Sequence, residues 1–198
     1  MMSRLFVLIL FLLGAPAWAS VRVGQVTLDP ANEIRADLLA RAVDVWQAHP
    51  HARRDELVVV DFAKPSTQER FYIVDTKTGA VEAFRTAHGK GSDAGDGRSA
   101  VNFSNEPNSE ASSLGTYLTA ARYSGKHGVS LMLDGLDPTN SNARARAVVL
   151  HSAPYMSSDF IAAHGRPGRS WGCFVVDPNA IDHVVARLEN GALIFASR

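Results

Sequence analysis

From Glu56 to its end, the chain alternates short apolar runs with turn-forming residues. The runs are rich in Val, Ile, Phe and Tyr, which suit the pleated surface of a sheet. This pattern predicts a mainly β fold that begins as an antiparallel meander. Strands are predicted over 57–62, 70–75, 80–87, 115–119, 129–133, 147–150, 173–176 and 191–196. The stretches 88–115 and 134–146 are predicted to be polar loops, and a loop as long as 88–115 is usually functional or disordered.

Two helices are predicted around this β region. Asp29 in the N-cap position and Pro30 at the first helical position predict a helix over 30–48. Its apolar residues fall on one face at helical spacing: Ile34, Leu38, Leu39, Ala42, Val45 and Trp46. A shorter helix is predicted across 181–187. We find no repeat or linker, and we expect one domain over 20–198 with a β core over 56–198.

Residues 1–19 have the pattern of a secretory signal peptide. A short positive segment precedes the apolar run 5–13, and Ala17-Trp18-Ala19 fits a cleavage site. A membrane-spanning helix would need about 20 apolar residues, far more than this run contains. We therefore expect cleavage after Ala19, export to the periplasm or cell wall, and no stable membrane anchor afterwards.

The charge balance argues against one class of partner. Lys+Arg and Asp+Glu both number 20, so the formal net charge is zero. Binding to nucleic acid usually requires an excess of positive charge, so we expect no nucleic-acid partner. Hydrophobic residues make up 46% of the chain, which is enough for a packed core.

Cys173 is the only cysteine in the chain. In an exported protein it is a buried inert residue, an intermolecular bridge or a functional free thiol, because it has no internal disulfide partner. His151 follows the predicted strand 147–150, and Cys173 opens the predicted strand 173–176. An imidazole beside a thiol activates it as a nucleophile. We predict that Cys173 and His151 are catalytic and meet in an accessible groove.

The residues before Cys173 extend this prediction. Gly172 is expected to let the backbone turn sharply, and we count it as catalytic because the amides around it can stabilise an oxyanion. Arg169 and Ser170 are expected to bind a substrate carboxylate or to orient the loop. His164 is a rival base, but it lies in a Gly- and Pro-rich loop, where placement is poorer than at a strand end.

Two further histidines, His88 and His127, each precede a glycine at the edge of a predicted strand or turn. With His151 they would offer three imidazoles to a metal ion, but their spacing matches no metal motif. We expect neither a metal nor a cofactor, and we predict that both histidines line the substrate cleft.

The segment around Cys173 resembles the catalytic domain of the L,D-transpeptidases, the YkuD-like family. The family motif is a histidine with a small residue, then a spacer and Ser/Thr-x-Gly-Cys, and it corresponds to His151-Ser152 and Ser170-Trp171-Gly172-Cys173. Similarity to the murein L,D-transpeptidase-like branch spans 57–195. Ser152 stands where many relatives have glycine, Trp171 where the wider family has histidine, and Phe174 where this branch often has proline.

The resemblance implies a β-sandwich or partly open barrel that acts on peptidoglycan stem peptides. Cys173 would attack the amide after the third residue of a tetrapeptide stem, and His151 would take the thiol proton. D-alanine would leave, and an amine of a second stem would resolve the acyl-enzyme as a 3→3 cross-link. We expect a monomer, with these substrate-binding residues: His88, His127, Ser152, Tyr155, Arg169, Ser170 and Trp171.

Two alternatives stay open at this stage. With water in place of the amine, the same acyl-enzyme would make the protein an L,D-carboxypeptidase or another hydrolase. The second alternative is a non-catalytic wall-binding module that keeps the fold, and the intact pair of His151 and Cys173 argues against it.

Overall fold

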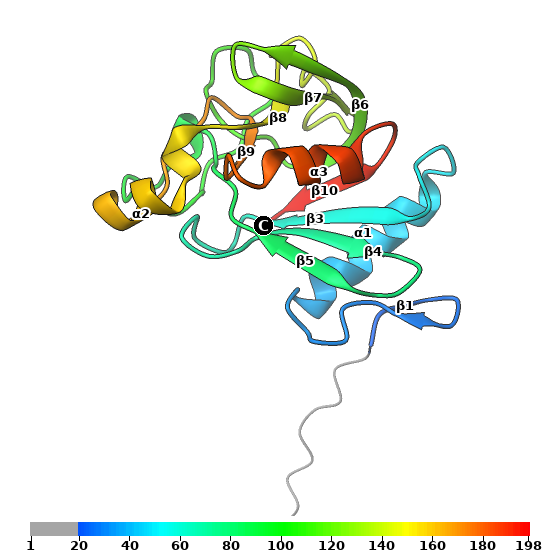
Figure 1. Ribbon diagram of the computed structural model, residues 1–198. Coiled ribbons are helices and arrows are strands. Elements are labelled where there is room, and N and C mark those ends of the chain that lie inside the picture. The colour runs from blue at the N-terminus through cyan, green and yellow to red at the C-terminus, as the bar shows by residue number, and fades with distance from the viewer. Residues whose placement is uncertain (1–19) are drawn as a thin grey trace, which may run out of the picture.

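Eight strands form one mixed sheet in the order β5-β4-β3-β10-β6-β7-β8-β9 (Figure 1). The structure is a computed structural model that describes residues 20–198, so the predicted signal peptide over 1–19 lies outside the described residues. The strands of the sheet are β3 (Glu56–Asp61), β4 (Phe71–Asp75), β5 (Val81–Phe84), β6 (Gly115–Gly125), β7 (Gly128–Gly135), β8 (Val149–Ser152), β9 (Phe174–Val176) and β10 (Leu193–Ser197). The short strands β1 (Arg22–Val23) and β2 (Val26–Thr27) form a separate hairpin. The prediction of a mainly β fold is confirmed.

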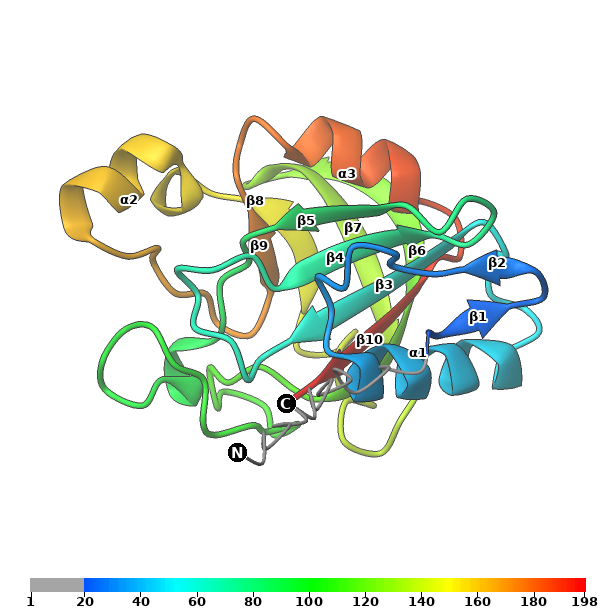
Figure 2. The same ribbon diagram turned by 90° about the horizontal axis from the view of Figure 1, so that it is seen from below.

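Strand β3 is buried along its whole length because both of its faces are covered. Val58 and Val60 point to a core that includes the helix α3 (Ile181–Leu188), whereas Leu57 and Val59 point to the helix α1 (Ala36–Ala48). Alternation of side chains between the faces of a strand explains why residues 57–60, between Glu56 and Asp61, are apolar without a break. Figure 2 shows α1 and α3 on opposite sides of this part of the sheet.

The larger core draws side chains from nearly every strand of the sheet. Phe71, Tyr117, Leu131, Leu150 and Phe174 come from five different strands and pack in one cluster with α3. A flat sheet could not bring these strands to one cluster, so the sheet curls around the core into a nearly closed barrel. The expected partly open barrel is confirmed.

The N-terminal helix begins later than predicted, at Ala36 instead of residue 30. Asp29 has a left-handed backbone (φ 50°), and its carboxylate accepts hydrogen bonds from the amides of Glu33 (3.0 Å) and Ile34 (2.8 Å). Asp29 therefore caps a turn that precedes the helix. Asp29 was predicted to cap backbone amides, which it does, but the capped amides belong to this turn and not to the helix.

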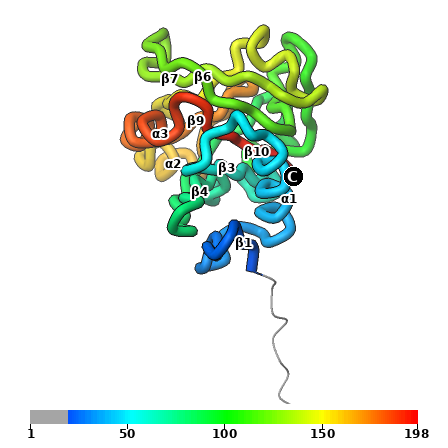
Figure 3. Tube along the Cα trace, turned by 90° about the vertical axis from the view of Figure 1, so that its right-hand side faces the viewer, coloured from blue at the N-terminus to red at the C-terminus, as the bar shows by residue number. Residues whose placement is uncertain are grey.

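Strand β6 is longer than the predicted strand 115–119. It continues to Gly125, and only Lys126 and His127 connect it to β7, because Gly125 pairs with Gly128. The sequence from Tyr123 was predicted as a turn, but cross-strand pairing with β7 keeps the chain extended. Figure 3 shows this β6–β7 hairpin at the end of the molecule opposite β1.

The loop predicted between His151 and Cys173 contains an additional helix, α2 (Ser158–His164). Its N-cap is Ser157, whose hydroxyl accepts from the amide of Phe160 (3.2 Å), and its C-cap is Gly165 in the left-handed region (φ 68°). α2 has 7 residues, about two helical turns, which is too short for its apolar residues to show a helical period. The sequence therefore did not predict this helix. None of the helices within residues 20–198 is both long and apolar enough to cross a bilayer.

Candidate active site

Parallel pairing of β8 and β9 brings His151 and Cys173 to one face of the sheet. Leu150 pairs with Phe174 and His151 pairs with Val175. Continuing this register back by one residue puts Cys173 level with Val149, two residues before His151. Side chains two residues apart on neighbouring parallel strands point to the same side, so this register predicts that the imidazole and the thiol are diagonal neighbours.

The His151 ring is held in a defined tautomer. It is buried, with 3% of its surface exposed, and its Nδ1 lies 2.8 Å from the carbonyl oxygen of Ser152. A carbonyl can only accept, so Nδ1 carries the proton and Nε2 is left as a free base. Burial lowers the pKa of His151 and outweighs the opposing bond to Ser152, and the nearby charges of His127 and Lys126 lower it further.

The Cys173 thiol is partly exposed and rests on a backbone carbonyl. Its Sγ lies 3.6 Å from the oxygen of Ala147, and no hydrogen bond within residues 20–198 joins it to His151. Burial raises the pKa of Cys173, while the Val149 amide and the charges of Arg146 and Lys126 act in the opposite direction. A raised thiol pKa beside a lowered imidazole pKa favours the neutral pair in the resting protein over the thiolate and imidazolium.

The turn that delivers Cys173 is braced by Ser170. The Ser170 hydroxyl donates to the Cys173 carbonyl (2.8 Å) and accepts from the Gly172 amide (3.1 Å). Ser170 is itself buried and is tied to the long loop by backbone bonds with His88 and Lys90. Ser170 thus fixes the turn from inside, and the Gly172 amide is already occupied, so the Cys173 amide is the better candidate to stabilise an oxyanion.

Gly172 is required at its position for two reasons. Its φ of 110° lies in a region that side-chain-bearing residues rarely adopt, and a Cβ there would lie 2.6 Å from the Ala111 carbonyl oxygen. Gly172→Ala is expected to destabilise the fold by about 2–4 kcal/mol and to displace Cys173. Displacing a reacting group by about 1 Å costs roughly 100-fold in rate. Thermal unfolding and the rate of Cys173 acylation measure the two effects.

Gly95→Ala is the matched control for this substitution. Gly95 has a similar φ of 101°, but a Cβ there meets nothing within 4 Å. Gly95→Ala should therefore lower the free energy of unfolding by the cost of backbone strain, about 1–3 kcal/mol, and should leave the acylation rate unchanged. Equal acylation rates for the two variants would contradict the close approach as the reason for Gly172.

The other residues beside Cys173 are placed differently from one another. The Trp171 side chain is 70% exposed, so its indole is free to meet a ligand. The Arg169 guanidinium forms an ion pair with Asp93, which agrees with the predicted alternative that Arg169 orients the loop and partly neutralises its charge for binding a carboxylate. Tyr155 packs in a small cluster with Cys173, and burial followed by the effect of Cys173 raises the pKa of Tyr155 to about 12.

The remaining histidines differ sharply in placement. His127 is exposed and stacks on His151, with ring centroids 4.3 Å apart and planes at 25°. His164 lies at the end of α2, stacks on Phe160 and makes its Nδ1 contact with the Phe160 carbonyl (2.9 Å). His164 thus lies on α2, whereas His151 lies on β8, which pairs with the strand that follows Cys173, and this placement favours His151 as the base.

His88 lies inside the protein and not on a substrate-facing surface. It is fully buried, and its Nδ1 lies 3.0 Å from the guanidinium of Arg70. Burial and the Arg70 charge lower the pKa of His88 to about 4, so the ring is neutral at physiological pH. Its backbone carbonyl accepts from the Ser170 amide, so His88 supports the turn instead of lining the cleft.

Two residues at this site carried no visible signal in the sequence. Ala147 has a left-handed backbone (φ 53°), which is strained for a residue with a Cβ, and its carbonyl oxygen is the acceptor nearest the thiol. Arg146 lies beside it and contacts the loop 88–115. Arg146 ends the predicted loop 134–146 and Ala147 opens the predicted strand 147–150, whereas the structure has Ala147 in a turn before β8.

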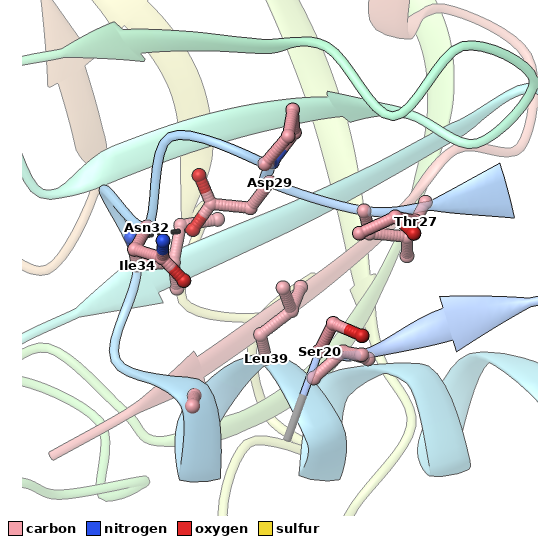
Figure 4. Close-up of a pocket in the computed structure, with 10 residues that line it drawn as sticks. Ser20, Thr27, Asp29, Asn32, Ile34 and Leu39 are labelled. Atoms are coloured by element: carbon pink, nitrogen blue, oxygen red, sulfur yellow. Dashed lines mark hydrogen bonds between the residues drawn. The ribbon is translucent and has the colours of Figure 1, made fainter. Parts of the chain in front are cut away.

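Two further features of residues 20–198 bear on the site, the grouping of metal-ligating side chains and a cavity near the N-terminal hairpin. Within residues 20–198, no three His, Cys, Asp or Glu side chains are grouped so that they could hold a metal ion. A cavity of about 210 Å³ lies between the N-terminal hairpin and α1, lined by residues such as Ser20, Asn32 and Leu39 (Figure 4). Its one carboxylate, Asp29, is already bonded to two backbone amides. This cavity therefore lacks a free catalytic group.

Comparisons with known proteins found one family model and several solved structures that match this chain. A family model described as the L,D-transpeptidase catalytic domain matches residues 30–197. The fold is similar to an L,D-transpeptidase from Mycobacterium smegmatis, with 14% identity and a TM-score of 0.43, covering 73% of this chain and 59% of that one. The helical cell shape determining protein Pgp2 from Campylobacter jejuni matches with 10% identity and a TM-score of 0.44, covering 78% of this chain and 54% of that one. The chain thus spans less than two thirds of these structures. The curated proteins contain no match.

Proposed function

Because the chain belongs to the L,D-transpeptidase catalytic domain family, we propose that it is an exported cysteine peptidyltransferase that acts on peptidoglycan stem peptides. Cys173 is the nucleophile and His151 is the general base. The observation that carries this proposal is the parallel register of β8 and β9, which sets the two side chains on one face. The Ser152 carbonyl, 2.8 Å from Nδ1, fixes the imidazole tautomer that can accept a proton.

The proposed first step is acylation of the thiol. Sγ attacks the carbonyl carbon of the third stem residue while Nε2 of His151 takes the thiol proton. The oxyanion that forms receives a hydrogen bond from the Cys173 amide. When the C–N bond breaks, His151 returns the proton to the amine of the leaving D-alanine, which leaves a thioester on Cys173.

The second step resolves the thioester with an amine of a second stem. His151 takes a proton from this amine as it attacks, and the thiol is released with its proton restored. The product is an amide between two third residues, a 3→3 cross-link. Water attacking the same thioester gives a free carboxylate instead, which is the activity of an L,D-carboxypeptidase.

The electrostatics of the pair predict a specific pH profile. Burial lowers the pKa of His151 below its ordinary value of 6.5, and the base must be unprotonated to act. Activity is therefore lost only as the pH falls through this lowered pKa, so the acid limb of kcat/KM should have its midpoint below pH 6.5. Acylation rates measured between about pH 5 and about pH 9 test this, since an ordinary histidine would titrate inside this range.

A second measurement separates the neutral pair from a preformed ion pair. Burial raises the pKa of Cys173, so the ultraviolet absorbance of a thiolate should be absent at neutral pH and should appear only in alkaline solution. Thiolate absorbance at pH 7 would contradict the neutral resting state while leaving Cys173 as the nucleophile.

Mass spectrometry of the intact protein tests the function directly. Incubation with a tetrapeptide stem should add the mass of the stem less D-alanine, and tandem spectra should locate it on Cys173. Adding a second stem as an amine acceptor should discharge the adduct as a cross-linked dimer, whereas discharge to the tripeptide alone would assign a carboxypeptidase. No adduct on the folded protein, either with stems or with a carbapenem, would favour the non-catalytic wall-binding module.

Export is part of the proposal and has its own test. The apolar run 5–13 and the cleavage pattern at Ala17–Ala19 support it. Protein recovered from outside the cytoplasm should begin at Ser20. A chain that keeps Met1 and stays inside the cell would contradict export.

A further inference from the structure

The Arg146 side chain clamps the long polar loop at four points. The guanidinium donates to acceptors that all lie within segment 104–113: from Nη1 to the Ser104 carbonyl (2.8 Å) and the Ser113 hydroxyl (2.7 Å), and from Nη2 to the Ala111 carbonyl (2.6 Å) and the Ser109 hydroxyl (3.2 Å). One planar group thus ties together residues that would otherwise be a free surface loop.

The clamped segment packs directly on the turn that holds the nucleophile. A Cβ at Gly172 would lie 2.6 Å from the Ala111 carbonyl oxygen and 3.1 Å from Nη2 of Arg146. The residue after Arg146 is the strained Ala147, whose carbonyl oxygen accepts from Sγ of Cys173. The Arg146-Ala147 pair therefore contacts the loop with a side chain and the thiol with its backbone.

The charge of Arg146 is not neutralised by a carboxylate. All four of its acceptors are neutral oxygens, and none of the ion pairs within residues 20–198 includes it. Arg144 and Arg169, by contrast, are each paired with an aspartate. An unneutralised cation beside a thiol favours the thiolate, and half-buried charges are poorly screened by salt.

We propose that Arg146 is a positioning residue for acylation, which holds segment 104–113 as a fixed wall against the Gly172–Cys173 turn and keeps a positive charge beside the thiol. It acts through the turn and the thiol, and it does not touch the substrate. This proposal rests on the proposed function, because it assigns Arg146 a role in the acylation of Cys173. It also states that this part of loop 88–115 is a preformed wall and not a lid that closes on the substrate.

Two substitutions separate the clamp from the charge, and a third is a matched control. Arg146→Gln removes the charge and most of the fork, whereas Arg146→Lys keeps the charge but cannot reach four acceptors at once. Arg144→Gln is the control, because Arg144 is an exposed arginine two residues away that pairs with Asp134 (2.7 Å).

Alkylation of Cys173 by iodoacetamide, followed against pH, measures the charge effect. The signal is unambiguous because the chain has one cysteine. In Arg146→Gln the alkylation midpoint should rise by about one pH unit, whereas in Arg146→Lys and Arg144→Gln it should stay where it is in the unsubstituted protein. A purely structural role for Arg146 would not be rescued by lysine in this measurement.

Hydrogen exchange and acylation measure the clamp. Amides in segment 104–113 should exchange faster in both Arg146 variants and unchanged in Arg144→Gln. Acylation by a carbapenem should slow by about 10–100-fold in Arg146→Gln, because misplacement of the turn and loss of the charge both raise the barrier. Arg146→Lys should fall between Arg146→Gln and the unsubstituted protein.

The outcomes that overturn the inference are distinct from failure of the proposed function. A folded Arg146→Gln with an unchanged alkylation midpoint and an unchanged acylation rate would overturn it. If Arg146→Gln fails to fold, unchanged exchange of segment 104–113 in Arg146→Lys, or a shifted midpoint in that variant, would overturn it. If the unsubstituted protein is not acylated at all, the proposed function fails, while the alkylation and exchange results still decide what Arg146 does.

Discussion

Replacing Cys173 with serine is expected to abolish acylation while leaving the fold nearly intact. A hydroxyl is far less acidic than a thiol, so the imidazole activates it much less, and removal of a nucleophile typically costs about four orders of magnitude or more in rate. The smaller oxygen keeps the shape of the site and can still donate to the Ala147 carbonyl. Mass spectrometry after incubation with a tetrapeptide stem measures the loss, and the thermal midpoint of unfolding reports the fold.

Comparing the acylation rate with the unfolding midpoint separates loss of the nucleophile from loss of the fold. Cys173→Ser should unfold within a few degrees of the unsubstituted protein, since one partly exposed sulfur contributes little to the core. An adduct that still forms on the serine variant would show that another group is the acceptor. A large drop in the unfolding midpoint would instead favour the buried, inert reading of the cysteine.

Replacing His151 is expected to reduce acylation by about 10²–10⁴-fold, the usual contribution of a general base. His151→Gln is the more informative variant because it fills the buried site and can still donate to the Ser152 carbonyl, yet it cannot accept the thiol proton. His151→Ala removes the same base but also leaves a space among buried groups, so part of its effect will be on stability. Acylation rates at fixed pH, with unfolding midpoints, distinguish the two losses.

His164→Ala serves as the control for the assignment of the base. The His164 ring is exposed and contacts Phe160 of its own helix, so its removal should change acylation by less than about twofold. If His164→Ala loses activity and His151→Gln keeps it, the assignment of the base is reversed. The two substitutions therefore decide between the two histidines directly.

Strands were predicted best where both faces of the strand are buried. β3 and β4 are covered on both faces, so residues 57–60 and 71–74 are continuous apolar runs, and their length and β-branched and aromatic residues favour strands. β6 was cut short because the sequence after Thr119 is polar and turn-like, and only its pairing with β7 keeps it extended to Gly125. Local propensity fails wherever the partner strand supplies the deciding interactions.

The N-terminal helix shows the same limit in its boundary. Leu38, Leu39, Ala42 and Trp46 of the predicted stripe are buried, because burial of that face against β3 and β10 stabilises the helix, whereas Val45 is half-buried and the unpredicted Val43 is buried. The start was placed six residues early since Asp29 and Pro30 have the preferred residue types for a helix start. The structure uses Asp29 to cap a separate turn, a choice that depends on its left-handed backbone.

The residues of the candidate site likewise fall into those that the sequence indicated and those whose contacts only the structure shows. The solitary cysteine, the histidine after an apolar strand and the glycine before the cysteine were visible in the chain, because nucleophile, base and tight turn each demand a particular residue type. Ser152 was assigned to substrate, yet its carbonyl orients the imidazole. For Ser170, the hydroxyl that braces the turn agrees with the predicted alternative that this residue orients the loop. Hydrogen bonds of this kind depend on orientation, which residue type does not encode.

By itself, the sequence determined the β-rich class of this protein and its membership of one domain family, and it predicted Cys173 as nucleophile and His151 as base, because these depend on residue type and on periodicity along the chain. Only the tertiary structure decided that His88 is buried, that Arg146 holds the loop beside Gly172, and that the thiol rests on Ala147. The Arg146 contacts join residues 33 to 42 positions apart, so no local pattern in the sequence can encode them. Burial and charge around the pair, which set both pKa values, arise from the same long-range packing.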